Sequence, residues 1–350
     1  MNIYRSKIYE QDLIEAISHL PFLSEFNNKS IMITGGTGLI GSALVDLLMQ
    51  SNDILNGRIH VYVAARNERG AQARFCKYID NKYFHIVSYD ASKVNRLHCP
   101  VDYIIHAASN ASPVNFQKYP IETMLDNFCG LYELLEYAYR KSAKGVLFVS
   151  SSEVYGKTMS TVPFCEDEYG YIDILDVRSA YPSGKRAAET LCAAFAKEKG
   201  LRTVIVRPGH IYGPTARRSD NRVSSAFAYA AADGTPLILK SDGAQIRSYC
   251  YMLDAVTAIL TVLLKGENAH AYNISNPDSI ISIKEMTELL AKIADVPICF
   301  EKPAENENKA FNPMLNSSLN SDKLQALGWK GYFNAHRGFS HTVNIIRESL

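Results

Sequence analysis

Over the first 214 residues, short apolar runs alternate with longer segments in which apolar residues recur at every third or fourth position. Short apolar runs bounded by turn residues predict strands, and the longer periodic segments predict amphipathic helices. We expect strands at 31–34, 59–63, 85–90, 101–109, 145–149 and 203–207, and helices at 43–49, 121–139 and 181–195. Strands that alternate with helices in this way predict an α/β fold with a doubly wound parallel sheet.

After residue 214 the pattern becomes less regular. One more strand and helix are expected within 247–264, and prolines interrupt the remaining segments. Such punctuation is typical of shorter elements joined by loops. We therefore expect two parts, a larger domain of residues 31–214 plus about 246–274 and a smaller C-terminal α/β lobe of residues 215–245 plus 275–350.

The chain begins with a segment, residues 1–30, that precedes the first predicted strand. Apolar residues recur there at helical spacing, at Leu13, Ile14, Ile17 and Leu20. This spacing predicts an N-terminal helical extension with one apolar face. The face could cover the main domain or a partner subunit, and the sequence leaves both open.

Composition narrows the class of protein. The 350 residues carry a formal net charge of +1, so no global field attracts nucleic acid or a membrane surface. No apolar stretch reaches the ~18 residues of a membrane-spanning helix. The seven cysteines are odd in number and scattered, and neither they nor the nine histidines show a metal-ligand spacing. We expect a soluble, cytoplasmic protein with reduced thiols and no bound metal.

A glycine-rich turn follows the first predicted strand directly. It reads Gly35-Gly-Thr-Gly38-Leu-Ile-Gly41 and leads into the apolar helix at 43–49. Glycines at this spacing let the backbone approach a pyrophosphate, which then meets free N–H groups at the helix N-terminus. Strand, turn and helix in this order predict a Rossmann-type dinucleotide site that includes Thr37, Leu39 and Ile40.

The end of the second strand bears on the choice between NAD and NADP. NAD enzymes usually carry an acidic residue there for the ribose 2′-hydroxyl, but this chain has Arg66. Arg66 suits the 2′-phosphate of NADP, and it equally suits stacking on adenine or exposure to solvent. Asp90, after the third strand, is expected near the adenine edge.

Polar residues cluster where the fourth and fifth strands end. The fourth ends in His106-Ala-Ala-Ser109, and its small residues would let a cofactor approach, whereas His106 is expected to be packed and hydrogen-bonded. The fifth ends in Ser150-Ser151-Ser152-Glu153. Burying idle polar side chains is costly, and open parallel sheets bind ligands at this edge, so we expect Ser151 to be functional.

Tyr181 and Lys185 are four residues apart at the start of a predicted helix, so both side chains lie on one face. A phenol normally keeps its proton up to pH ~10. A nearby ammonium and the positive charge of a nicotinamide cofactor would lower that pKa and make Tyr181 a general base for a hydroxyl that loses hydride. By itself, the spacing is more typical of a surface Tyr–Lys pair.

Five segments together resemble the extended short-chain dehydrogenase/reductase family of nucleotide-sugar epimerases, dehydratases and decarboxylases. They are the glycine turn 35–41, His106–Ser109, Ser150–Gly156, Tyr181-x-x-x-Lys185 and Arg207–Pro214. Within this family the pattern is most similar to the UDP-glucuronate decarboxylases, through the segments 108–116, 151–156, 165–181, 220–225 and 243–247.

The resemblance implies specific roles. Tyr181, Lys185, Ser151 and Glu153 would be catalytic, with Ser151 and Tyr181 beside the sugar 4′-hydroxyl, Lys185 on the nicotinamide ribose, and Glu153 near C5′. The implied cofactor set is Gly35, Thr37, Gly38, Leu39, Ile40, Gly41, Arg66, Asp90, Ala91, Ala107, Ala108, Ser109, Asn127, Tyr181, Lys185 and Pro208. The implied substrate set is Ser112, Asn115, Ser152, His210, Arg222 and Arg247, with Arg222 on the diphosphate and Arg247 near the carboxylate.

The expected function is therefore a nucleotide-sugar-modifying enzyme that works through a transient 4-keto sugar with recycled NAD. Its best-fitting reaction is UDP-glucuronate decarboxylation. A 4-epimerase is the first alternative. A 4,6-dehydratase ranks lower, since Ser152 stands where those enzymes carry Asp, and an NADPH-dependent keto-sugar reductase is a further alternative that Arg66 supports.

Other features depart from or extend the family pattern. His210 replaces the usual Asn of the sugar-phosphate loop, and Lys240 replaces an aromatic residue, so base recognition could differ. The helices that contain Asn127 and begin at Tyr181 resemble those that form a four-helix dimer interface in this family, which implies a homodimer.

Overall fold

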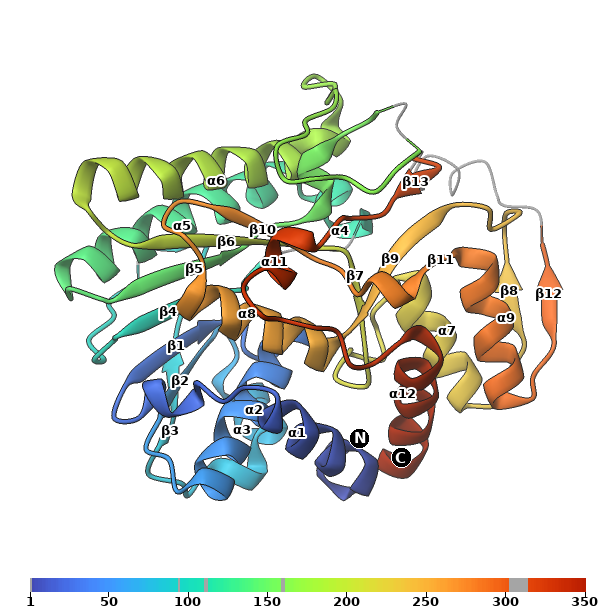
Figure 1. The fold of residues 1–350 in the computed structure, drawn as a ribbon, viewed down its shortest axis with the longest axis horizontal. Coiled ribbons are helices and arrows are strands. Elements are labelled where there is room, and N and C mark those ends of the chain that lie inside the picture. The colour runs from blue at the N-terminus through green and yellow to red at the C-terminus, as the bar shows by residue number, and fades with distance from the viewer. Residues whose placement is uncertain (1, 94, 110–112, 159–160, 302–313) are drawn as a thin grey trace.

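The computed structural model describes residues 2–93, 95–109, 113–158, 161–301 and 314–350. A seven-stranded, all-parallel sheet forms its centre, in the order β10-β6-β5-β4-β1-β2-β3 (Figure 1). The strands are β1 (Ser30–Thr34), β2 (His60–Ala65), β3 (Phe84–Ser88), β4 (Tyr103–His106), β5 (Gly145–Val149), β6 (Thr203–Pro208) and β10 (Ala271–Ile274). The predicted doubly wound parallel sheet is confirmed.

Helices cover both faces of this sheet because its strands are apolar on both sides. One face packs under α2 (Leu39–Leu55), α3 (Glu68–Arg74) and α8 (Met252–Lys265), and Ile31 and Ile33 point into that core. The other packs under α5 (Pro120–Arg140) and α6 (Ala180–Lys199), and Met32 points into that second core. Alternate side chains of β1 therefore pack against helices on opposite faces of the sheet, as the two-residue period of a strand requires.

The strand order reverses between β1 and β4. In an open parallel sheet, the crevice at the carboxyl ends of two such strands is where ligands bind. The glycine turn follows β1, and the segment around Ser109 follows β4. Both predicted cofactor segments thus lie at this point.

Shorter strands form a smaller lobe at the right of Figure 1. In a four-stranded sheet, β9 (Ile246–Tyr251) pairs with β7 (His210–Tyr212), β11 (Ile280–Ser282) and β13 (Asn316–Ser317), while β8 (Leu237–Leu239) pairs with β12 (Ile298–Phe300). Its helices are α7 (Val223–Ala232), α9 (Ile283–Ala294) and α12 (Ala335–Ser349), whereas α11 (Asp322–Gln325) packs beside β10 of the large sheet. Thus β9 belongs to the smaller sheet, whereas α8, which follows it, packs on the large sheet. The division of residues into two domains stays a prediction.

The N-terminal segment packs against the chain's own helices. After η1 (Ile3–Arg5), α1 (Lys7–Ser18) starts at Ser6, whose side chain accepts a hydrogen bond from the backbone N–H of Tyr9. Helix α1 lies against α2, α8 and α12. Leu13 and Ile17 are buried, but Ile14 is 46% exposed. The sequence left open whether this segment covers the main domain or a partner subunit. The structure shows that it covers the main body of its own chain.

A buried carboxylate fixes this segment in place. Asp46 of α2 accepts hydrogen bonds from the hydroxyls of Tyr4 (2.8 Å) and Tyr9 (2.6 Å) and from the guanidinium of Arg74. At the other side of α1, buried Asp12 accepts from the Tyr251 hydroxyl at 2.8 Å. The two carboxylates join residues 4–12 to both parts of the molecule.

Three short helices complete the part of the chain near the site, and three more lie elsewhere. Near the site are α4 (Pro113–Lys118), η4 (Ser152–Tyr155) and η5 (Val177–Ser179), and elsewhere are η2 (Leu23–Phe26), η3 (Cys76–Tyr78) and η6 (Pro277–Ser279).

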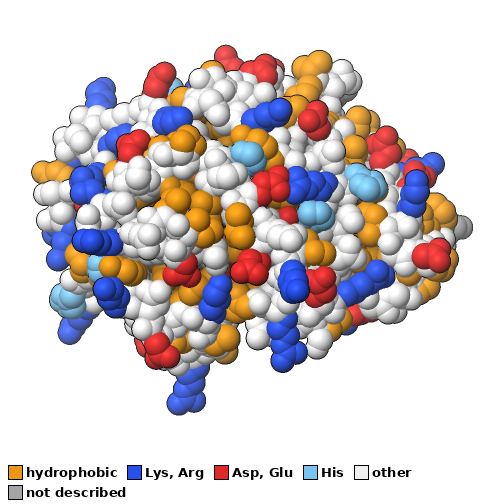
Figure 2. Space-filling view, turned by 60° about the horizontal axis from the view of Figure 1, so that its bottom comes forward, with side chains coloured by type: hydrophobic (Ala, Val, Ile, Leu, Met, Phe, Trp, Pro, Cys, Tyr) orange, Lys and Arg blue, Asp and Glu red, His pale blue; other side chains and the backbone are white. Residues whose placement is uncertain are grey.

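All seven cysteines are free. No helix in the described ranges is long and apolar enough to cross a membrane. On the face drawn in Figure 2, basic and acidic side chains are interspersed.

Candidate active site

The glycine turn between β1 and α2 is shaped by close backbone packing. Gly35 has φ +66°, and a Cβ there would lie 2.6 Å from the carbonyl oxygen of Ala107. A Cβ on Gly41 would lie 2.3 Å from the carbonyl oxygen of Gly35, so α2 packs tightly on the turn. At Gly38, the N-cap of α2, a Cβ would meet only the Gly35 oxygen, at 3.2 Å. The fold itself therefore requires Gly35 and Gly41, whereas glycine at position 38 suits the close approach of a ligand.

A segment of the smaller lobe contacts this turn. The Thr215 hydroxyl donates to the Leu39 carbonyl at 2.8 Å, and the Arg217 guanidinium donates to the Thr37 hydroxyl at 3.0 Å. Ile40 lies in the same first turn of α2. The two parts of the chain thus meet at the N-terminus of α2, where a diphosphate would be bound.

The small residues after β4 lie at the same edge of the sheet as the glycine turn. The backbone N–H of Ala108 lies 3.3 Å from the Thr34 hydroxyl, which also hydrogen-bonds His106 at 2.7 Å. Burial and the charge of Lys185 lower the pKa of His106 to about 3, so it is a neutral, packed histidine, as expected. The Ser109 hydroxyl donates to the Asn127 side chain at 3.1 Å, which joins α5 to the same edge.

Around the expected adenosine position, Arg66 lies among carboxyl groups. Its charge favours ionisation of both Asp90 and Asp126. Burial nevertheless raises the pKa of Asp126, and one of its carboxyl oxygens is buried with no partner in the described part of the chain. Ala91 packs against Gly130 of α5 nearby. No pattern in the sequence indicates Asp126, because it lies within α5 and outside any motif.

Tyr181 and Lys185 lie one turn apart on α6, and both are buried. The Lys185 ammonium donates to the carbonyl of Val149, the last residue of β5, at 2.8 Å and lies 5.8 Å from the centre of the Tyr181 ring. The Tyr181 ring stacks on Phe116 of α4 at 5.0 Å. The burial argues against a surface pair, which was the other interpretation of this spacing.

Burial dominates the pKa values of both members of this pair. Burial raises the pKa of Tyr181 to about 12, and the negative charge of Glu153 adds to this, although hydrogen bonds from Ser151 and Ser109 act in the opposite direction. Burial lowers the pKa of Lys185 to about 7, against the charge of Glu189. The predicted lowering of the Tyr181 pKa by the ammonium together with a bound nicotinamide stays a prediction, and without the cofactor the burial of the phenol dominates.

The loop after β5 brings Ser151 and Glu153 beside Tyr181. The Ser151 hydroxyl caps η4 by accepting the backbone N–H of Glu153 at 3.2 Å, and it also hydrogen-bonds Tyr181. The carboxylate of Glu153 accepts two hydrogen bonds from Arg178, each 3.1 Å long. Ser152 is partly buried in the same short helix. All four predicted catalytic residues thus meet in one place.

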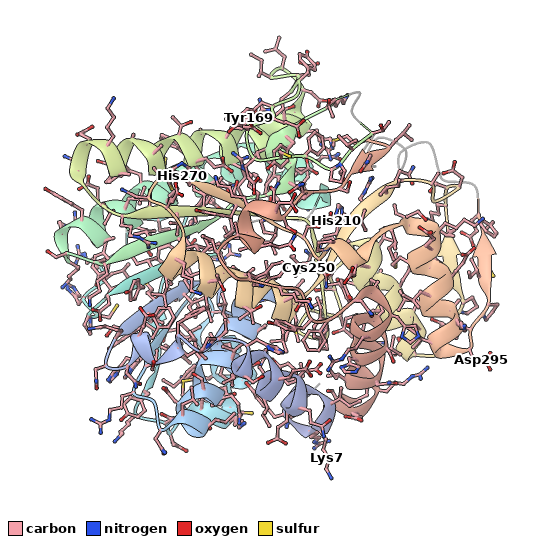
Figure 3. The ribbon with its side chains drawn as sticks, in the orientation of Figure 1. Lys7, Tyr169, His210, Cys250, His270 and Asp295 are labelled. Atoms are coloured by element: carbon pink, nitrogen blue, oxygen red, sulfur yellow. The ribbon has the colours of Figure 1, made fainter. Side chains whose placement is uncertain are left out.

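The smaller lobe contributes positive charge to the site. His210 begins β7 and lies near the middle of the molecule (Figure 3), just after Pro208, the last residue of β6. Burial lowers the pKa of His210 to about 3, and the charges of Arg247 and Arg222 lower it further. The neutral ring therefore lies close to both arginines, and its Nδ1 is buried with no partner among the residues described.

The two arginines are held differently. Arg247 is buried in β9 and donates to the carbonyls of Ile246 (2.9 Å) and Met314 (3.0 Å), whereas Arg222, at the N-cap of α7, is paired with the carboxylate of Asp220. The charge of Arg222 also acts on Tyr181 and that of Glu153 on Arg247. Ser112 lies outside the described residues. Asn115 lies in α4, and its side chain is likewise not described.

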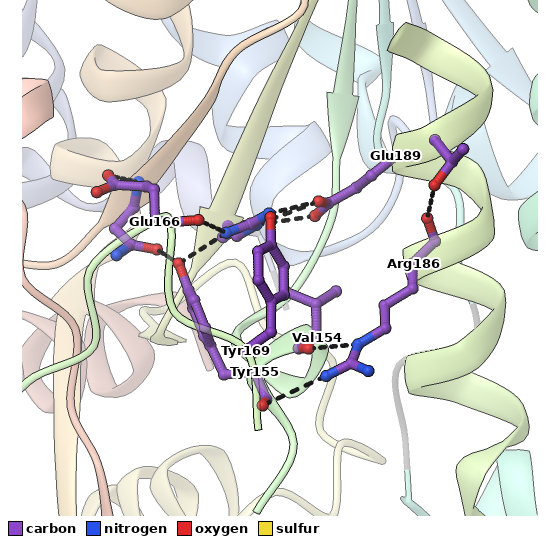
Figure 4. A network of polar contacts seen from close by, with 9 residues as sticks. Val154, Tyr155, Glu166, Tyr169, Arg186 and Glu189 are labelled. Atoms are coloured by element: carbon purple, nitrogen blue, oxygen red, sulfur yellow. Dashed lines mark hydrogen bonds and ion pairs between the residues drawn. The ribbon is translucent and has the colours of Figure 1, made fainter. Parts of the chain in front are cut away.

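A buried polar network holds the loop that carries Ser151 and Glu153 (Figure 4). The Arg207 guanidinium donates to Glu189 of α6 at 2.7 Å and to the Tyr155 hydroxyl at 3.1 Å. Arg186, also on α6, donates to the carbonyl of Val154 at 2.7 Å. Because Val154 and Tyr155 directly follow Glu153, this network fixes the loop that carries Ser151 and Glu153. Sequence reasoning missed it, since its partners come from four separate segments.

The arrangement is that of a glycine turn at the carboxyl edge of the parallel sheet with a Ser–Tyr–Lys cluster at the same edge. No group of three or more His, Cys, Asp or Glu side chains in the described ranges could hold a metal ion. The sequence profile of the NAD dependent epimerase/dehydratase family matches residues 31–275. The chain belongs to this family. Its members are NAD-dependent enzymes, in accord with the glycine turn.

Two relatives show how far the likeness extends. The chain is 31% identical over 343 residues to UDP-glucuronic acid decarboxylase 1 of Xenopus tropicalis, which covers 97% of this chain and 77% of that protein. It is 33% identical over 306 residues to UDP-glucuronic acid decarboxylase 6 of Arabidopsis thaliana, which covers 87% of this chain and 84% of the relative.

Solved structures agree on the fold. UDP-glucose 4-epimerase of Thermotoga maritima matches with a TM-score of 0.77 at 25% identity, covering 91% of this chain and 99% of that one. UDP-glucuronic acid 4-epimerase of Bacillus cereus, solved with UDP-glucuronic acid and NAD, gives a TM-score of 0.77 at 20% identity, with 91% and 99% covered. The second comparison supports the fold alone.

Proposed function

We propose that this enzyme is a nucleotide-sugar decarboxylase of the UDP-glucuronate type, which works with tightly held NAD. The observation that supports this proposal is that Ser151, Tyr181, Lys185 and Glu153 lie together, with the guanidinium group of Arg247 close to Glu153. Planar guanidinium groups suit the carboxylate of a hexuronate. The decarboxylase relatives and the family's chemistry point in the same direction.

The cofactor would be held by the glycine turn, Asn127 and Lys185, and the residues present fit it. When bound, NAD would supply the hydride acceptor for C4′ of the sugar, the hydride for the later reduction, and positive charge near Tyr181. Tyr181 takes the 4′-hydroxyl proton, and that added charge offsets the burial that raises the pKa of its phenol. Lys185, held by the Val149 carbonyl, orients the ribose.

The C4′ ketone lies β to the carboxylate, which makes loss of CO2 possible. The electron pair of the broken C5′–C6′ bond enters an enolate whose oxygen is on C4′. Ser151 and the Tyr181 hydroxyl stabilise this oxyanion by hydrogen bonding. C5′ takes up a proton from water, the ketone is reduced again, and Tyr181 returns its proton to O4′.

We further propose that NAD is preferred over NADP. The Arg66 guanidinium lies close enough to Asp90 and Asp126 to favour ionisation of both. A 2′-phosphate beside Arg66 would therefore face two carboxyl groups. Binding titrations with both dinucleotides test this, and tighter binding of NADP would restore Arg66 as a 2′-phosphate ligand.

We propose a homodimer formed through α5 and α6. Helix α5 exposes an apolar stripe at helical spacing, with Ile121 70%, Leu125 52% and Tyr132 48% exposed. A stripe of this kind is typical of a helix that packs against a partner. Light scattering should give twice the chain mass. A Leu125→Asp variant should give the monomer mass, while Ile14→Asp on α1 should stay dimeric.

The test of the reaction is product analysis by mass spectrometry after incubation with UDP-glucuronate, with and without added NAD. We expect a nucleotide pentose, release of CO2 and no net NADH. A 4-epimerase is the second candidate, since it needs only the Ser151–Tyr181–Lys185 cluster and room for the ketone to rotate. It would return a hexuronate of unchanged mass with C4′ inverted, and stoichiometric cofactor consumption would indicate a reductase.

We also propose a cytoplasmic location, which accords with the free cysteines.

A further inference from the structure

The carboxylate of Glu153, which lies beside Tyr181, is paired with the guanidinium of Arg178. Both terminal nitrogens of Arg178 donate to the two oxygens of Glu153, each at 3.1 Å, which is a bidentate ion pair. Both side chains are 21% exposed, so the pair is partly buried and is neither free in solvent nor deep in the core.

The local structure fixes Arg178 in this position. It lies in η5, whose first turn is capped by Asp176 accepting the Arg178 backbone N–H at 2.9 Å. Its guanidinium carbon lies 5.9 Å from the centre of the Phe116 ring, which stacks on Tyr181. Its Nε is buried and has no partner among the described residues. The side chain is therefore part of the wall around Tyr181.

The charges around Glu153 have a consequence for substrate choice. Glu153 faces Arg178 directly, and its charge acts on Tyr181 and on Arg247 of the neighbouring lobe. An unpaired carboxylate at this place would repel an anionic sugar, whose own carboxylate must come close to the same groups. Like charges brought together in a partly desolvated site are strongly unfavourable.

We propose that Arg178 determines specificity for an anionic sugar by neutralising Glu153. The inference rests on the proposed function and deepens it. Arg178 acts through Glu153, so it is a positioning and charge-compensating residue, and Arg247 stays the group that contacts the sugar carboxylate. A neutral hexose nucleotide would not need this compensation.

The experiment compares two ligands that differ in charge at C6′. Calorimetric titration of the NAD-loaded enzyme gives the affinity for UDP-glucuronate and for UDP-glucose. Arg178→Gln should weaken UDP-glucuronate binding by about 10- to 100-fold and UDP-glucose binding by less than ~3-fold, because only the former is repelled by the exposed carboxylate. Removing that carboxylate too, in Glu153→Gln/Arg178→Gln, should restore UDP-glucuronate affinity to within ~3-fold of the wild type.

A matched control separates charge from loop structure. Arg186 holds the same loop through the carbonyls of Val154 and Gly170 and does not hydrogen-bond the Glu153 carboxylate. Arg186→Gln should change both affinities by the same factor. Equal losses for the two ligands in Arg178→Gln, or failure of the double variant to recover, would overturn the inference.

The same titrations keep this inference separate from the proposed reaction. A wild-type enzyme that binds UDP-glucuronate without decarboxylating it contradicts the proposed reaction, and the charge-selective loss in Arg178→Gln would still support the role of Arg178. A wild-type enzyme that binds neither nucleotide sugar overturns both.

Discussion

Glu189→Gln should destabilise the protein strongly, because Glu189 neutralises a buried guanidinium. Arg207 is 2% exposed, and Glu189 accepts its Nε–H at 3.0 Å and its terminal N–H at 2.7 Å. Removing one partner of a buried ion pair costs roughly 3–5 kcal/mol, because the other charge stays buried without compensation. Gln keeps one acceptor oxygen, so we expect a loss of about 3 kcal/mol in the free energy of unfolding.

The chain offers a matched control on the same helix. Glu198 of α6 pairs with Lys199 at 3.4 Å, and its side chain is 75% exposed. Glu198→Gln should therefore change the free energy of unfolding by no more than ~0.5 kcal/mol. Urea unfolding followed by the fluorescence of Trp329, the one tryptophan in the sequence, measures both. Equal stabilities for the two variants would refute the role assigned to the Arg207 network.

Three further results are expected. If Tyr181 moves the proton as proposed, Tyr181→Phe should lower kcat at least ~100-fold. NAD should still bind in a dinucleotide titration, because the proposed cofactor site at the glycine turn is unchanged. Burial raises the pKa of Asp254 to about 7, above its unfolded value, so the stability it contributes is fully present below pH ~4 and is lost as the pH rises to about 7. The stability advantage of wild type over Asp254→Asn should then shrink between pH 4 and 8, and an advantage that grows with pH would contradict the raised pKa. Asp126→Asn should narrow the preference for NAD over NADP in competitive titrations, since it removes one carboxyl group near Arg66.

The sequence predicts most of the fold because its local signals agree with one another. The glycine turn has an apolar strand before it and an apolar helix after it, and only one position in a doubly wound sheet fits that order. The helix that contains Asn127 was expected at 121–139 and spans Pro120–Arg140. Strands of the smaller lobe were harder to predict, because β8, β11 and β13 are short and pair with segments far away in the chain.

Site residues that belong to a sequence motif could be predicted. Contacts that form only when distant segments fold together could not. Tyr181, Lys185 and Ser151 stand in recognisable patterns, and the structure brings them together. The partnership of Arg178 with Glu153 joins residues 25 positions apart across a loop of no regular period, so no spacing rule indicates it. The pKa of Tyr181 likewise depends on burial, which the residue pattern alone does not show.

The central claim is that this site breaks the C5′–C6′ bond of a hexuronate nucleotide. The most direct measurement is ¹³C NMR of a reaction with UDP-glucuronate labelled at C6′. We predict that the carboxylate signal disappears and that ¹³C-labelled CO2 and bicarbonate appear at the same rate, with no labelled carbon left on the nucleotide product and no net NADH. A label that stays on the sugar while the C4′ configuration inverts would contradict the account and identify a 4-epimerase.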